Sequence, residues 1–239
     1  MPRFLPGLVS SLALVAALSG CEVPTTPAQP VQPVDDGPRV PAQRAARNFV
    51  TVVERVEPVA EQVCRERGRV PRCDFQILVD DRPGQPSNAF QTEDEQGRPT
   101  IIFTLALIED ARNQDELAFI LGHEAAHHIE GHIARSTTNA NIGAAVLGGL
   151  AAAYGYGDGT VQTAANIGAA VGQRQYSKEY ELAADSLGAR IAARAGYDPV
   201  AGAAYFARIP DPGDRFLGSH PANSRRQEAV RQSVAGGGA

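Results

Sequence analysis

One stretch of five residues, His123-Glu124-Ala125-Ala126-His127, limits what this chain can fold into more than any other. It lies within an apolar run, 117–129, whose spacing predicts a helix. Because an α-helix takes about 3.6 residues per turn, side chains four positions apart project from one face, about 40° apart. Two imidazoles held in this way can bind one Zn²⁺, and Glu124 can then take a proton from water at the metal. The stretch therefore predicts a metal site on a helix.

The helix that carries this stretch has recognisable start signals. Asn113 is a suitable N-cap, and Glu116 follows three residues later, as in a capping box. The helix is expected to continue to about Arg135. His128 and His132 continue it without lying on the metal-facing side, and His132 is expected to be the more exposed of the two.

A catalytic zinc ion has three protein ligands and one open position, so another segment has to supply the third ligand. No further histidine follows at the short spacing typical of metzincins. Glu179, Glu181 and Asp185 lie in a later predicted helix. Because Glu181 and Asp185 are four residues apart, they share a face, so one can bind the metal while the other orients a ligand histidine. His220, in a loop, can donate to the oxyanion of a tetrahedral intermediate.

The first 43 residues predict export and anchoring. Arg3 precedes an apolar run that is too short to be a good membrane span, which is typical of a signal peptide over residues 1–20. The run ends in Leu18-Ser19-Gly20-Cys21, which resembles a bacterial lipobox and implies a lipid on Cys21. The alternative is an ordinary signal peptide. Residues 21–43 are rich in proline and predict an extended tether to the membrane.

Residues 44–234 are expected to form one domain. Cys64 and Cys73 predict a disulfide, because two cysteines in an exported chain usually pair. Strands over 88–91 and 100–104 predict a hairpin, which either offers an edge to which a peptide substrate pairs or is purely structural. The other predicted elements are helices over 44–67, 105–112, 176–195, 198–208 and 222–234, a strand over 74–80 and a disordered tail over 235–239.

Residues 136–173 differ in composition from the rest of the chain. They are dominated by alanine and glycine, and Asp158 is their single charged residue. The heptapeptide Ala-Asn-Ile-Gly-Ala-Ala-Val occurs twice, at 140–146 and 165–171, with a glycine-rich turn between the copies. This pattern predicts two closely packed helices. The segment is a packed helical hairpin, a lid, a membrane-surface element or an arm that binds assembly partners of the envelope.

Net charge excludes one class of partner. The formal charge of −5 argues against nucleic acid. A hydrophobic content of 43% and a charged content of 21% are typical of a globular chain, which has room here for one sizeable domain.

Four motifs, in order, resemble the HtpX/BepA and CAAX-prenyl-protease type of zinc metallopeptidase. They are Asn88-Ala89-Phe90, the stretch 123–127, the segment 177–185, and Ser219-His220-Pro221 with Arg226. The resemblance extends over roughly 45–230. It implies an α+β, mostly helical gluzincin-like fold with a small β-sheet beside the motif helix.

The resemblance also implies residue roles. His123, His127 and Glu181 would bind one Zn²⁺, and Glu124 would act as general base and proton shuttle. Asp185 would orient a ligand and His220 would stabilise the oxyanion, with Arg226 in support. Asn88, Ala89 and Phe90 would contact substrate. Lys178 and Ala106 depart from the family pattern, which often has arginine and glycine there, and neither change is expected to touch the metal.

These observations predict a membrane-tethered zinc metalloendopeptidase. It would face the periplasm of a bacterial cell envelope, with the outer membrane preferred, and would hydrolyse unfolded or misassembled envelope proteins through zinc-activated water. The alternative is a chaperone or assembly factor in which the protease site is blocked by residues 136–173.

Overall fold

The computed structural model describes residues 40–175, 177–213 and 220–236. The expected signal peptide and Cys21 lie outside the described residues. The helices are α1 (Ala42–Arg67), α2 (Leu105–Asp110), α3 (Gln114–Ile129), α4 (His132–Ala153), α5 (Asp158–Gln175), α6 (Ser177–Arg194), α7 (Pro199–Gly202) and α8 (Asn223–Ala235), with a 3₁₀ turn over Ala203–Ala207. The strands are β1 (Gln76–Asp80), β2 (Ala89–Glu93) and β3 (Pro99–Thr104).

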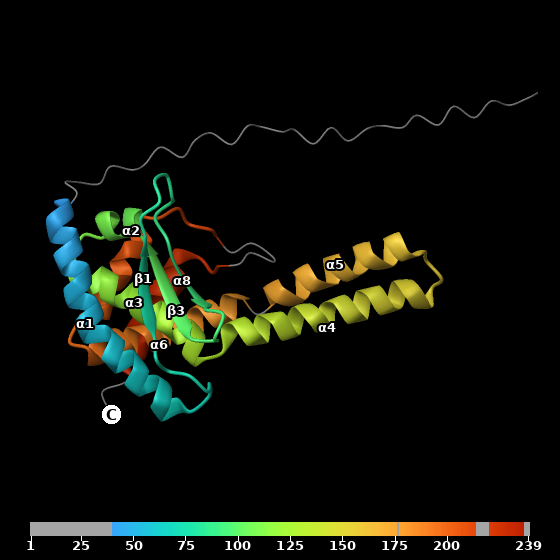
Figure 1. The fold of residues 1–239 in the computed structure, drawn as a ribbon, viewed down its shortest axis with the longest axis horizontal. Coiled ribbons are helices and arrows are strands. Elements are labelled where there is room, and N and C mark those ends of the chain that lie inside the picture. The colour runs from blue at the N-terminus through green and yellow to red at the C-terminus, as the bar shows by residue number, and fades with distance from the viewer. Residues whose placement is uncertain (1–39, 176, 214–219, 237–239) are drawn as a thin grey trace, which may run out of the picture. The chain divides into compact units, whose positions relative to one another are not determined.

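The three strands form one small sheet in the order β1-β3-β2 (Figure 1). β3 pairs in parallel with β1 and antiparallel with β2, so the predicted hairpin is confirmed. Ile101 and Phe103 of β3 are fully buried, because the central strand packs its apolar side chains against the helices. The expected α+β, mostly helical fold is therefore confirmed.

Helix α1 packs mainly against α3 and carries the apolar stripe seen in the sequence. Phe49, Val52 and Val56 are buried, and the Phe49 ring centroid lies 5.1 Å from that of Phe103. Gly68 ends the helix at φ 58°, a conformation that costs glycine little. The helix starts two residues before the predicted domain boundary at 44, and α8 likewise includes Ala235, which had been assigned to the tail.

A disulfide between Cys64 and Cys73 joins the last turn of α1 to the segment before β1. The loop that it closes, 65–72, is also held by charge. Arg67 and Arg69 both pair with Glu130 at the C-terminal end of α3. This loop is therefore fixed to the end of the helix that carries the two histidines.

Helix α3 runs through the core and begins as predicted. The Asn113 side chain accepts a hydrogen bond from the Glu116 backbone N–H, at 2.9 Å. The Glu116 carboxylate accepts from the Arg112 N–H and also pairs with Arg208, at 2.5 and 2.8 Å, which ties the start of α3 to the 3₁₀ turn.

The predicted end of this helix, Arg135, was wrong. α3 ends at Ile129, and Gly131 adopts a left-handed conformation with φ 67° before α4 begins at His132. Glycine reaches that conformation without a steric penalty, so the chain can break and restart a helix within two residues.

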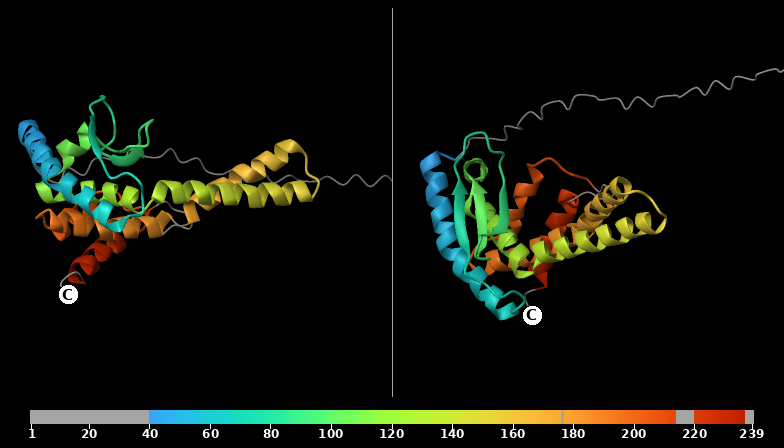
Figure 2. Two further views of the ribbon diagram at one scale, coloured as in Figure 1. Left: turned by 60° about the horizontal axis from the view of Figure 1, so that its bottom comes forward. Right: turned by 45° about the vertical axis from the view of Figure 1, so that its right-hand side comes forward.

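Helices α4 and α5 form the expected helical hairpin (Figures 1 and 2). They pack mainly against each other, and their other main contacts are with α3 and α6 at the base of the hairpin. A Cβ on Gly143 would lie 2.0 Å from the carbonyl oxygen of Gly168, so these backbones approach as closely as only glycine allows. Within the described part of the chain, no helix combines the length and the apolar content needed to cross a bilayer.

Candidate metal centre

Helix α3 presents His123 and His127 on one face, in the core of the protein. His123 is buried and His127 is half-buried, with flanking residues such as Ala125 and Ala126 packed into the apolar core. The Nε2 atoms of the two histidines lie 3.0 Å apart. Helical spacing alone therefore brings two ligand nitrogens to one point, as the sequence indicated.

Two glycines bring α6 against α3. A Cβ on Gly122 would lie 2.6 Å from the carbonyl oxygen of Gly188, and a Cβ on Gly188 would lie 2.6 Å from the backbone nitrogen of His123. The two helices are therefore in backbone contact at the first histidine. Glu181 and Asp185 precede Gly188 by seven and three residues, so they share its face and point toward α3. Sequence reasoning missed both glycines, although their spacing from the ligands was visible.

Glu181 completes a three-residue cluster with the histidines. One ligand atom from each of His123, His127 and Glu181 lies within 4.8 Å of the others. Glu181 Oε1 lies 3.3 Å from His127 Nε2, and Oε2 lies 3.7 Å from His123 Nε2. Although burial acts to raise it, hydrogen bonds from His127 and His220 hold the pKa of Glu181 well below its usual range. The carboxylate is thus kept charged, as a metal ligand must be.

Asp185 stands behind His123. Its Oδ1 lies 2.9 Å from His123 Nδ1, and its side chain is completely buried. Arg226 of α8 binds both Asp185 oxygens, at 2.8 and 2.7 Å, and stacks 4.0 Å over the Phe206 ring. Arg226 Nη2 also lies 3.3 Å from Glu181 Oε2. The resemblance implied roles for Asp185 and Arg226, and in the structure Asp185 contacts His123 and Arg226 contacts Glu181.

His132 stands behind His127, and the expectation that it would be exposed was wrong. It is 4% exposed, its Nδ1 lies 3.0 Å from His127 Nδ1, and its ring stacks on Tyr180 at 4.5 Å. Burial, with the nearby charge of His127, lowers the pKa of His132 to about 3, so it is neutral at pH 7 and can accept the His127 proton. His128 is also buried, and its Nε2 donates to the Arg72 carbonyl at 2.7 Å.

Glu124 and His220 approach the cluster from two sides. Glu124 lies beside His123 on α3 and is half-buried, and burial raises its pKa above the usual range of a glutamate, which makes it a better proton acceptor. His220 Nδ1 lies 3.1 Å from Glu181 Oε2, and the His220 side chain is 51% exposed. Since a carboxylate only accepts, Nδ1–H of His220 donates to Glu181. Ser219, which precedes it in the motif, lies outside the described residues.

Strand β2 is one of the two edge strands of the sheet. The Thr104 N–H donates to the Asn88 carbonyl at 2.9 Å, and the Asp94 N–H donates to the Arg98 carbonyl at 3.0 Å. Because inward and outward pairing alternate along an antiparallel strand, Ala89, Gln91 and Glu93 turn their N–H and C=O groups outward. Of the three residues expected to contact substrate, only Ala89 therefore offers its backbone to a pairing chain. The Asn88 backbone is bound to Thr104, and Phe90 pairs with Ile102.

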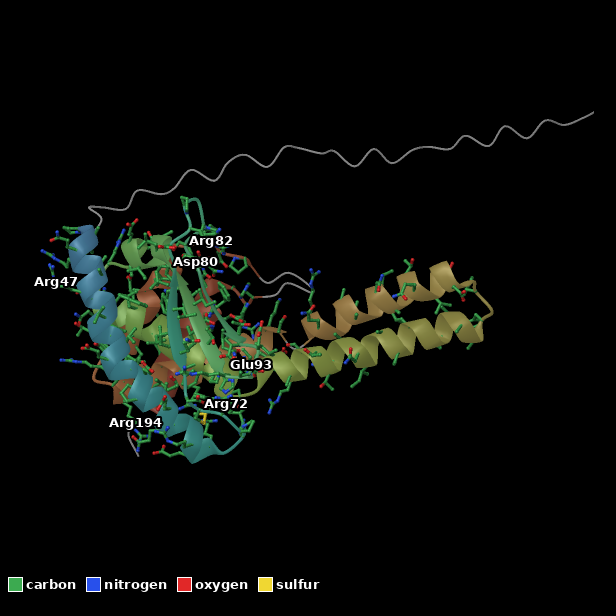
Figure 3. All side chains as sticks on the ribbon, viewed as in Figure 1. Arg47, Arg72, Asp80, Arg82, Glu93 and Arg194 are labelled. Carbon is green, nitrogen blue, oxygen red and sulfur yellow. A yellow bond between two sulfur atoms is a disulfide. The ribbon has the colours of Figure 1, made fainter. Side chains whose placement is uncertain are left out.

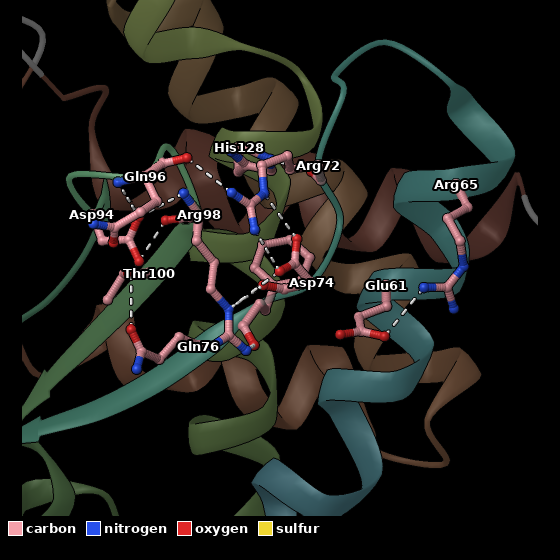
Figure 4. A network of polar contacts seen from close by, with 11 residues as sticks. Glu61, Arg65, Arg72, Asp74, Gln76, Asp94, Gln96, Arg98, Thr100 and His128 are labelled. Atoms are coloured by element: carbon pink, nitrogen blue, oxygen red, sulfur yellow. Dashed lines mark hydrogen bonds and ion pairs between the residues drawn. The ribbon is translucent and has the colours of Figure 1, made fainter.

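This edge and one of the three cluster residues, His127, line the same cavity. A cavity of about 720 Å³ is bounded by Gln91 and Glu93 of β2, by His127, by the disulfide loop and by the start of α4. Arg72 holds in place the loop that forms one wall of this cavity. Its side chain donates to the Gln96 carbonyl at 2.8 Å and to Asp74, and its backbone carbonyl accepts from His128 (Figures 3 and 4). A chain that paired with β2 would therefore run past the cluster.

The fold and this site define a class of protein. Gluzincin metallopeptidases have two histidines four residues apart on one helix, with a glutamate beside the first histidine. A second helix supplies their third ligand, as α6 does here. The sequence comparisons agree, since the model of Peptidase family M48 matches residues 51–234. The chain belongs to peptidase family M48.

Two curated relatives share part of the chain. The mitochondrial metalloendopeptidase OMA1 of Arabidopsis thaliana is 27% identical over 137 residues, which are 56% of this chain and 27% of that protein. A Vibrio cholerae serotype O1 protein described as "Putative beta-barrel assembly-enhancing protease" is 33% identical over 109 residues, 42% of this chain and 22% of that protein. The matches thus span about a quarter of the length of each relative.

Proposed function

We propose that this chain is a zinc metalloendopeptidase, held to a bacterial membrane by a lipid on Cys21, that cleaves unfolded or misassembled proteins of the cell envelope. The observation that carries the catalytic part is the cluster of His123, His127 and Glu181 beside the free edge of β2. Tethering and periplasmic location rest on the lipobox-like sequence at residues 18–21, and the substrate class on the resemblance to envelope proteases.

The ligand set fits zinc. Two imidazole nitrogens and one carboxylate oxygen are a common catalytic zinc set. The Nδ1 atoms of both histidines are already engaged, by Asp185 and by His132, which leaves the Nε2 atoms facing Glu181. When bound, zinc polarises the substrate carbonyl and makes water acidic enough to attack near neutral pH.

Residues of the chain would perform the remaining steps. Glu124 takes a proton from the attacking water and returns it to the leaving amine, because it lies beside the cluster and burial raises its pKa. To donate to the oxyanion, His220 must carry two protons or leave Glu181, since its Nδ1–H is already used there.

The edge strand would hold the substrate. An extended peptide can pair with the outward N–H and C=O groups of Ala89, Gln91 and Glu93, which selects unfolded chains, because a folded protein rarely offers a free strand. The Gln91 side-chain oxygen is buried and has no hydrogen-bond partner among the described residues. A donor from the bound peptide would satisfy it.

A cleavage assay tests the proposal. Purified protein is incubated with unfolded casein, with and without a zinc chelator, and zinc is then added back. Cleavage that the chelator stops and zinc restores is the expected result, with Glu124→Gln as an inactive control. If casein stays intact even after deletion of 137–172, the peptidase assignment of this site is wrong and the alternative, a blocked assembly factor, takes its place.

A further inference from the structure

The α4–α5 hairpin has an internal two-fold symmetry that its sequence repeat predicts. Gly143 and Gly168 are equivalent positions in the two copies of the heptapeptide, and each packs on the other: a Cβ on either would lie 2.0 or 2.1 Å from the partner's carbonyl oxygen. A two-fold axis that exchanges two antiparallel helices is perpendicular to the plane that contains both. Equivalent side chains of the two copies therefore lie on the same side of the hairpin.

This symmetry gathers exposed apolar side chains on one face. Ile142 is equivalent to Ile167, and Val146 to Val171. Leu150 follows Val146 by four residues and extends the row along α4. Four of the five are more than half exposed, at 57% for Ile142, 54% for Ile167, 53% for Val146 and 52% for Leu150. This group of five side chains is the apolar face, and it would be costly to leave in water.

The positive charges of the hairpin lie near the apolar face, and its negative charge lies on the opposite face. Arg135 precedes Ile142 by seven residues and Arg174 follows Ile167 by seven, so each arginine lies within about 20° of the apolar face. Both are exposed and stand at the base, where α4 begins and α5 ends. Asp158 precedes Ile167 by nine residues, which is half a turn away, on the opposite face. At the far end, Tyr154 and Tyr156 are 80% and 59% exposed.

We propose that the apolar face of the α4–α5 hairpin lies on the surface of a membrane that contains anionic phospholipid. An element that lies in the membrane–water interface has its apolar side chains on one face and cationic side chains near the lipid headgroups. It also carries tyrosines at the level of the headgroups. The hairpin has all of these features, and its one acidic residue is on the opposite face. A second copy of the chain fits less well. A stable dimer buries about 800 Å² per partner, and five half-exposed side chains offer no more than about half of that.

This inference is independent of catalysis and places the cavity beside α4 close to the bilayer. The chain contains no tryptophan, so one substitution introduces a single fluorescent reporter. Ile167→Trp and Leu150→Trp report on the apolar face. Gln162→Trp is the matched control, because Gln162 is exposed on α5 about 140° around the helix from Ile167. The purified full chain is mixed with vesicles whose phosphatidylcholine is brominated on the acyl chains, with and without phosphatidylglycerol.

With phosphatidylglycerol present, Ile167→Trp and Leu150→Trp should shift to the blue and lose most of their emission, while Gln162→Trp should change little. Adding Arg135→Gln and Arg174→Gln should remove the dependence on phosphatidylglycerol, whereas Arg47→Gln on α1 should not (Figure 3). Equal quenching at Gln162→Trp, or none at the apolar face, overturns the proposal. So does a blue shift without vesicles that grows with protein concentration, which would assign the face to a second copy. A casein assay on the same samples reports separately on the peptidase.

Discussion

His123 Nδ1 lies 2.9 Å from Asp185 Oδ1, a buried oxygen that Arg226 also binds. The ligand histidine is therefore oriented by a residue 62 positions later in the chain, which an arginine from a third helix holds in turn. The site depends on the packing of α3, α6 and α8 as much as on the motif itself.

Asp185→Asn should weaken metal binding about 10- to 100-fold, because the amide orients His123 less well and leaves Arg226 without its main counter-charge. Loss of one partner of a buried ion pair should also destabilise the fold by about 3–5 kcal/mol. Metal competition with a chromogenic chelator and thermal unfolding measure the two effects. Glu179→Gln, an exposed change on the same helix, should alter neither, and equal effects from both variants would contradict this role for Asp185.

His132→Ala should lower metal affinity by about tenfold or more, since His127 Nδ1–H loses its acceptor. His128→Ala provides the contrast. It removes a hydrogen bond to the Arg72 carbonyl and so should lower the unfolding temperature without changing the affinity of the folded protein for metal. If both variants lower the metal affinity equally, the prediction is wrong, because His132 would then contribute only to packing.

Glu124→Gln should retain one metal ion per chain and lose cleavage by at least about 10²-fold, because the amide cannot accept a proton from water. Metal content by elemental analysis and casein cleavage are measured on the same sample. A variant that loses the metal would show that Glu124 supports the ligands instead of handling protons.

Gln91→Pro should reduce cleavage of unfolded protein without unfolding the enzyme, since it removes an N–H that points away from β3. The adjacent change Thr92→Pro removes an N–H that faces β3, and it should destabilise the sheet. kcat/KM and thermal unfolding of the two variants separate the effects. If Gln91→Pro cleaves casein as fast as the wild type, substrate does not pair at this edge.

Gly188→Ala should destabilise the protein by several kcal/mol, because its Cβ would lie 2.6 Å from the His123 backbone nitrogen and would push α6 away from α3. Metal binding by the remaining folded protein should weaken with it. Gly149→Ala is the matched control, since a Cβ there meets nothing within 4 Å, and alanine in an exposed helix should stabilise by about 0.5–1 kcal/mol. Denaturant unfolding measures both changes, and a neutral Gly188→Ala would mean that the two helices tolerate separation.

Local sequence patterns predicted secondary-structure elements correctly where neighbouring residues determine the structure. The Asn113 cap, the apolar stripe of α1 and the β2–β3 hairpin follow from nearest neighbours along the chain, and the structure has all three. The end of the motif helix was missed, because one left-handed glycine, Gly131, interrupts a pattern that otherwise continues. The same break in the helix explains why His132 was wrongly expected to be exposed. In an unbroken helix it would point about 140° away from His127, and only the break turns it back.

The sequence by itself determined the chemistry of α3, because four-residue spacing on a helix fixes two imidazoles and one carboxylate relative to one another, whatever surrounds them. The tertiary structure alone decided their partners. The backbone contact of Gly122 with Gly188 brings Glu181 and Asp185 to the histidines, and Arg226 and His132 then close around them. Such contacts depend on how helices pack, and several packings are compatible with one pattern of apolar and polar residues.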